Sequence, residues 1–116
     1  MKYALIFLSL GLLLTACSRQ DAKLQVAGSW TSSNGHTTAI YDPDGSFSMT
    51  TRSDSTNSLA GTWLIRDGVL ITTITNAPDM FRALVGQVHQ YNITHLDDHQ
   101  LDYEDVKTHV TFNYSR

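Results

Sequence analysis

The stretch from His36 to Thr50 reads HTTAIYDPDGSFSMT, two strand-like segments around a tight turn. At its centre, Asp42-Pro43-Asp44-Gly45 has the composition of a β-turn, because proline fixes φ and glycine accepts the conformation that closes the turn. After the turn, Phe47, Met49 and Thr51 alternate with polar residues, which is the period of a strand with one buried face. The stretch therefore predicts an antiparallel hairpin.

Further strand-like segments joined by turns lie on both sides of this hairpin. Asn34-Gly35 is a strong two-residue hairpin signal. One segment differs, because its apolar residues are spaced as on a helix; it starts with Asn76 and Pro78 and ends at Gly86. The predicted strands are residues 26–31, 36–41, 46–52, 59–65, 69–75, 87–96, 101–104 and 106–114, with a polar loop at 53–57 and a short helix near 78–85. This order predicts an all-β fold, either a small eight-stranded antiparallel up-and-down barrel or a strongly bent meander sheet.

The N-terminal segment has the features of an export signal. Lys2 supplies one positive charge, and the run from Ala4 to Leu14 is almost entirely apolar. A membrane-spanning helix needs about 20 apolar residues, so this run is too short to span and fits the apolar region of a signal peptide. We therefore predict a signal peptide at residues 1–16.

This signal ends in Leu14-Thr15-Ala16-Cys17, which resembles the bacterial lipobox. The resemblance implies that Cys17 receives a diacylglycerol and further acyl chains such as palmitate. Ser18 in the next position implies the outer membrane of a Gram-negative envelope, on its periplasmic face. The alternative is an ordinary secretory signal with a chance cysteine near its end. We expect residues 17–25 to be the lipidated cysteine and a short polar tether, and residues 26–116 to be one domain.

Composition narrows the classes of partner. The 100 residues after the predicted signal carry seven basic and eleven acidic side chains, a formal net charge of −4, with no basic run. Nucleic acid is therefore not an expected partner. Cys17 is the only cysteine, so no disulfide can form within the chain.

Two segments repeat the pattern Gly-x-Trp, Gly28-Ser29-Trp30 and Gly61-Thr62-Trp63. Together with the 40–47 hairpin, Asp67-Gly68-Val69-Leu70 and Tyr91-Asn92-Ile93, they resemble the small lipocalin-like domains of bacterial lipoproteins. The resemblance implies a barrel that binds a small apolar ligand or a lipid in its mouth. We expect most of the aromatic side chains to point inward and largely to fill the interior.

Two groups of residues are candidates for a ligand site or a lid. Trp30 and Trp63 either plug the bottom of the barrel as core residues or stack on a ligand. The 76–86 segment places Met80, Phe81, Leu84 and Val85 on one helical face. We expect this face to be buried, either as a cap on one barrel end or as a mobile lid or partner surface.

No set of residues is marked by spacing as a catalytic or metal site. His89 and His95 share the predicted strand face of Tyr91, but nothing resembles a zinc motif, and no nucleophile motif is present. We therefore expect neither an enzyme nor a cofactor. The competing functional hypothesis is a protein-interaction module, such as an inhibitor, an immunity protein or an envelope assembly factor.

Overall fold

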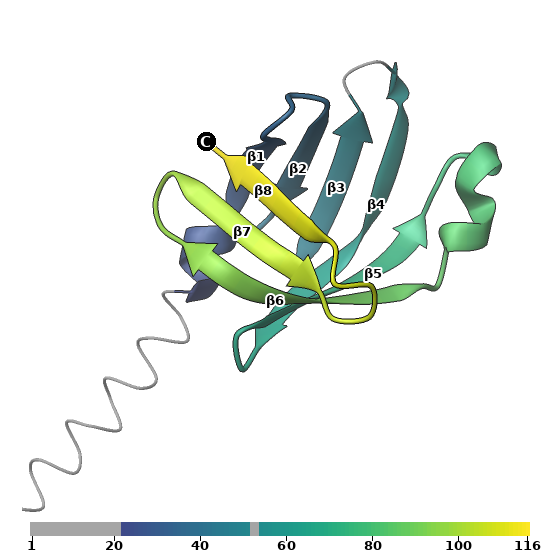
Figure 1. Cartoon of the computed structure of the whole chain (residues 1–116). Coiled ribbons are helices and arrows are strands. Elements are labelled where there is room, and N and C mark those ends of the chain that lie inside the picture. The colour runs from purple at the N-terminus through teal and green to yellow at the C-terminus, as the bar shows by residue number, and fades with distance from the viewer. Residues whose placement is uncertain (1–21, 52–53) are drawn as a thin grey trace, which may run out of the picture.

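Eight antiparallel strands form a closed barrel in which each strand pairs with the next along the chain and β1 pairs with β8 (Figure 1). The computed structural model describes residues 22–51 and 54–116. The strands are β1 (Gly28–Ser32), β2 (Thr37–Tyr41), β3 (Ser46–Thr51), β4 (Asp54–Arg66), β5 (Val69–Asn76), β6 (Val88–Leu96), β7 (Gln100–Asp105) and β8 (Thr111–Ser115). The predicted all-β up-and-down barrel with one short helix is confirmed.

The predicted tight turns join the strands where the sequence placed them. Asp67 (φ 52°) and Gly68 (φ 77°) both adopt positive φ between β4 and β5, which matches the twist of a two-residue hairpin. At the decisive 42–45 turn, the amide of Gly45 donates to the carbonyl of Asp42 over 3.0 Å. In β4, Gly61 is required by close packing, since a Cβ there would lie 1.8 Å from the carbonyl oxygen of Thr73.

A short helix at residues 22–26 lies against one end of the barrel, which we call the closed end (Figure 1). Two predictions are wrong here: residues 22–25 are not a flexible tether, and Val26 is not in the first strand. Val26 is fully buried, and its carbonyl accepts a 2.8 Å hydrogen bond from the indole of Trp30. Ala22, Lys23, Leu24 and Gln25 favour a helix, but a helix this short is not stable alone, so burial of Val26 stabilises it.

The predicted polar loop at 53–57 is also wrong, because β4 begins at Asp54. Asp54 pairs with Thr51, and Ser58 pairs with Thr50, across a register shift. A β-ladder is made by backbone groups, so a run of polar residues can extend a strand when its neighbour offers free amides and carbonyls.

The last strand begins at Thr111, and residues 106–110 are a turn, not the start of a strand as predicted. The carboxylate of Asp105 accepts bonds from the amides of Lys107 (2.8 Å) and Thr108 (3.0 Å). His109 then adopts a φ of 61°. This side-chain capping favours the turn over the strand that Val106 and Val110 suggest.

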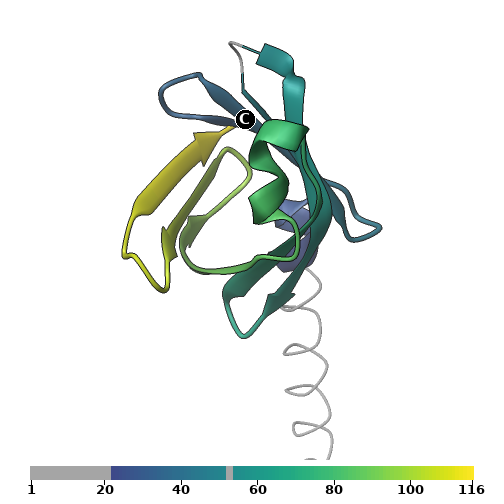
Figure 2. The ribbon, with the colours of Figure 1, turned by 90° about the vertical axis from the view of Figure 1, so that its right-hand side faces the viewer.

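The predicted helix is a 3₁₀ helix, η1 (Asp79–Leu84), at the opposite end of the barrel, which we call the open end (Figure 2). The expectation of a buried cap is wrong, because η1 has no buried residue, whereas the alternative of a mobile lid or partner surface stays a prediction. A 3₁₀ helix has three residues per turn, and η1 is broken at Phe81, so no continuous apolar face forms. Of the predicted face, Leu84 packs against the core, whereas Met80 is 80% exposed.

The predicted signal peptide, Cys17 and the tether residues up to 21 lie outside the described residues. Over residues 22–51 and 54–116, no helix is both long and apolar enough to span a membrane.

Candidate ligand cavity at the open end of the barrel

A cavity of about 200 Å³ lies inside the barrel, between its middle and η1. Its walls come from inward-facing positions of β2 to β7, where alternate residues point to the barrel axis. We call it the inner cavity, and its lining residues are Tyr41, Phe47, Met49, Leu59, Thr72, Ile74, Leu84, His89, Tyr91 and Tyr103. It is an apolar space with a few hydroxyl groups, the usual character of a small-molecule site.

Three tyrosines form a connected group beside this cavity. The hydroxyls of Tyr41 and Tyr103 lie 3.4 Å apart, within hydrogen-bonding distance. The rings of Tyr103 and Tyr114 stack with their centroids 5.5 Å apart. The three residues come from β2, β7 and β8, so only closure of the barrel brings them together. We call them the tyrosine chain.

Burial raises the pKa of these phenols further above neutral pH. Desolvation is the largest cause that raises the pKa of Tyr41, Tyr103 and Tyr114 above the ordinary value of 10. It is also the main cause that raises the pKa of Tyr91 to about 12, with a contribution from the negative charge of Asp105. All four groups are therefore protonated at neutral pH and can both donate and accept hydrogen bonds.

A second hollow of about 330 Å³ opens next to the inner cavity, and we call it the vestibule. Met49, Tyr91 and Tyr103 line both spaces and so form the partition between them. The other vestibule residues come from the β1–β2 hairpin and from β8: Ser32, Ser33, Asn34, Thr37, Thr111, Phe112, Asn113 and Tyr114. The vestibule is the more polar of the two spaces, as expected for an entrance from solvent.

The five predicted candidates divide between the two ends of the barrel. Leu84 lines the inner cavity, while Met80 and Phe81 on the same helix are exposed. Trp30 and Trp63 are buried near the closed end and line neither the inner cavity nor the vestibule. Each indole N–H donates to a backbone carbonyl, of Val26 and Asp42 respectively.

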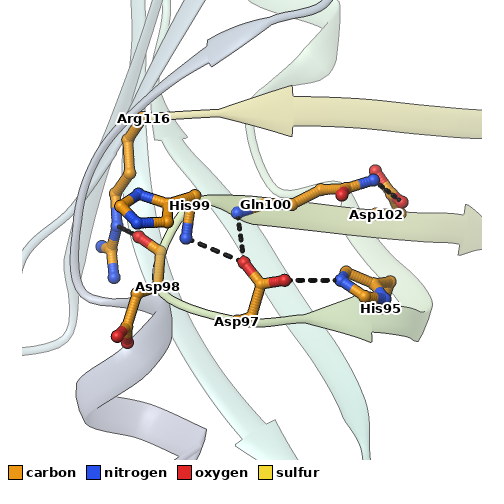
Figure 3. A network of polar contacts seen from close by, with 7 residues as sticks. All are labelled: His95, Asp97, Asp98, His99, Gln100, Asp102 and Arg116. Atoms are coloured by element: carbon orange, nitrogen blue, oxygen red, sulfur yellow. Dashed lines mark hydrogen bonds and ion pairs between the residues drawn. The ribbon is translucent and has the colours of Figure 1, made fainter.

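The histidine side chains do not come together at one site. His89 lines the inner cavity, but a register shift after Ile93 turns His95 outward, so the prediction that the two share a face is wrong. His95 instead pairs with Asp97 over 2.8 Å in an exposed turn near the closed end (Figure 3). Among the described residues, no three His, Cys, Asp or Glu side chains are grouped so that they could hold a metal ion.

Solved structures share this architecture. A lipocalin-like protein from Bacteroides uniformis aligns over 79% of this chain and 98% of its own, with a TM-score of 0.62 and 14% identity. The chain has a lipocalin-like fold. An uncharacterized protein from Bacteroides eggerthii aligns over 78% of this chain and 98% of its own, with a TM-score of 0.61 and 10% identity. No family model and no curated protein matches the sequence.

The sequence analysis missed the tyrosine chain of this lipocalin-like barrel as a site. Tyr41, Tyr103 and Tyr114 are separated by up to 73 positions, and no spacing rule links them. The usable signal was their position, because each lies on the inward face of its strand. Alternation therefore predicts that the tyrosines enter one interior, but not which of their hydroxyls and rings come into contact.

Proposed function

We propose that this protein is a lipoprotein held at the periplasmic face of the outer membrane through Cys17, and that its barrel binds a small apolar ligand or a lipid without catalysing a reaction. The observation that carries the binding proposal is the inner cavity, an apolar space under η1 with tyrosine hydroxyls in its wall. The lipocalin-like fold supports a ligand-binding role only as an analogy, since one fold serves many functions.

The lipid anchor is supported by the order of residues before Cys17. Leu14, Thr15 and Ala16 follow an apolar run of signal-peptide length. A single acyl chain holds a protein to a membrane only marginally, so two or three chains on Cys17 would be needed for stable attachment.

The anchor is tested by metabolic labelling with palmitate and by fractionation. The wild-type chain should incorporate label and sediment with outer membranes, and Cys17→Ala should lose both properties. An unlabelled wild-type protein would contradict the proposed lipidation and leave the binding proposal intact.

Ligand binding is tested by native mass spectrometry of the full chain released from nanodiscs. A retained small-molecule mass is expected in the wild type. Leu84→Trp should remove it by filling the cavity, whereas Met80→Trp, on the exposed side of the same helix, should keep it. Absence of any retained or rebindable small molecule would refute the binding proposal.

The second candidate function is a protein-interaction module. Six apolar side chains stand exposed around the open end: Met80, Phe81, Val85, Val88, Val106 and Val110. Exposed apolar patches often mark contact sites. This candidate predicts a co-purifying envelope protein that is lost in Met80→Ser but retained in Leu84→Trp, the reverse of the pattern expected for ligand binding.

A further inference from the structure

The size of the inner cavity limits what can enter it. Its volume is about 200 Å³. An apolar protein cavity of about 150 Å³ accepts benzene, whereas sites for drug-sized ligands measure about 300–1,000 Å³. The inner cavity therefore matches one ring with a small substituent and is too small to enclose a whole lipid.

The residues that line both spaces also limit the charge that a ligand can carry. None of the described residues that line the inner cavity or the vestibule is an aspartate, glutamate, lysine or arginine, and their one histidine, His89, lies near the carboxylate of Asp105. A charged ligand would lose its hydration there without gaining a counter-ion. The negative charge of Asp105 near Tyr91 further disfavours an anion.

The tyrosine chain has a hydroxyl proton that no hydrogen bond within the chain uses. Each hydroxyl carries one proton, so Tyr41, Tyr103 and Tyr114 together offer three donors. The bond between Tyr41 and Tyr103 uses one of these protons. Of these two hydroxyls, which both belong to residues lining the inner cavity, one therefore keeps a donor for a group in the cavity, and the matching group is a hydrogen-bond acceptor.

We propose that the inner cavity takes an uncharged molecule of about one ring, bearing a hydrogen-bond acceptor that meets the tyrosine chain. This inference rests on the proposed binding function and names the chemical class of its ligand. The apolar ring lies against Ile74, Leu84 and Leu59, while the acceptor faces the partition between the inner cavity and the vestibule.

Four probes of similar size test the ligand class by ¹⁹F NMR, with the full chain in nanodiscs and empty nanodiscs as the partition reference. They are 4-fluoroacetophenone (neutral, with an acceptor), 4-fluorotoluene (neutral, without one), 4-fluorobenzoate (anionic) and 4-fluorobenzylammonium (cationic). 4-Fluoroacetophenone should bind about fivefold more tightly than 4-fluorotoluene, the ratio expected for one added hydrogen bond. Both charged probes should bind at least about a hundredfold more weakly than 4-fluoroacetophenone.

The double variant Tyr41→Phe/Tyr103→Phe removes both tyrosine-chain hydroxyls from the lining of the inner cavity and serves as the diagnostic variant. It should bring the two neutral probes within about twofold of each other, while the affinity for 4-fluorotoluene is retained. The single variants Tyr41→Phe and Tyr103→Phe are the second measurement if the double variant folds poorly, and each should keep the preference for 4-fluoroacetophenone because the remaining hydroxyl is free to donate. Met80→Ala is the matched control and should leave all four affinities unchanged.

Two results would contradict the inferred ligand class without contradicting the proposed binding function. One is a charged probe that binds as tightly as 4-fluoroacetophenone, and the other is a retained lipid mass in native mass spectrometry with no binding of either neutral probe. Loss of every retained or rebindable ligand would instead refute the proposed function itself.

Discussion

The two ends of this barrel are built in opposite ways. At the closed end, Val26 and Trp30 are fully buried, Trp63 is nearly so, and both indole N–H groups bond to backbone carbonyls. Arg116 adds a bond to the carbonyl of Ala27 and lies 4.0 Å from the centre of the Trp30 ring. At the open end, η1 has no buried residue. Buried side-chain contacts are therefore concentrated at the closed end, and the candidate binding site lies towards the open end.

The largest expected effect comes from removing the plug of the closed end. Trp30→Ala deletes a fully buried ring and leaves a cavity, and it should lower the free energy of unfolding by about 3–5 kcal/mol. Urea denaturation followed by circular dichroism measures this loss. A loss below about 1 kcal/mol would show that the closed end does not dominate stability.

Gly61→Ala should have the next largest effect. Its new Cβ would lie 1.8 Å from a backbone oxygen and 2.8 Å from the Phe47 ring, so strands β4 and β5 must separate, at a cost of about 3 kcal/mol. Gly68→Ala is the control, because Gly68 has φ +77° but no atom within 4 Å of the added Cβ. It should cost about 1–2 kcal/mol through backbone strain alone. Equal losses in both variants would contradict the close-packing argument.

A smaller effect should appear in acid, at the turn near the closed end shown in Figure 3. A hydrogen bond from His95, joined by the amides of His99 and Gln100, lowers the pKa of Asp97 from 3.8 to about 2. A lowered pKa means that the stabilisation is complete above about pH 4 and is lost as the pH falls towards 2. Asp97→Asn should flatten the stability profile in this window. An unchanged profile would show that the contact is negligible in solution.

The smallest effect is expected at the open end. Met80→Ser replaces a side chain that is 80% exposed, and it should change the free energy of unfolding by less than about 0.5 kcal/mol. Hydrogen exchange should also be fast across residues 79–84 and slow in β2 and β7. Strong protection of η1 in the isolated protein would mean that the two ends are equally fixed.

Strands and turns were predictable where local chemistry decides them. Alternating apolar residues marked β3, and Asp67-Gly68 marked a hairpin, because these signals act over a few residues. The helix at 22–26, the polar start of β4 and the turn at 106–110 were missed. Each depends on a tertiary contact or a side-chain cap: the helix on the burial of Val26 and its bond from Trp30, the start of β4 on its pairing with β3, and the turn on Asp105.

The candidate site was predictable only in part, for the same reason. Leu84 was singled out by its apolar spacing and does line the inner cavity. Tyr103 and Tyr114 were expected only as filling of the interior, because nothing in their own segments shows which hydroxyls will meet. The bulge after Ile93, which turns His95 outward, likewise depends on how β6 and β7 pair.

The chain enters the barrel at the closed end, while the inner cavity opens at the other. If the protein is anchored at Cys17 as proposed, only residues 17–21 separate the lipid from the helix at 22–26. Fully extended, this segment spans at most about 18 Å. The base of the barrel would then rest on the bilayer and its mouth would open to water. A ligand would be exchanged by diffusion through the aqueous phase, so its solubility in water, and not its partition into the membrane, would set how fast the site fills.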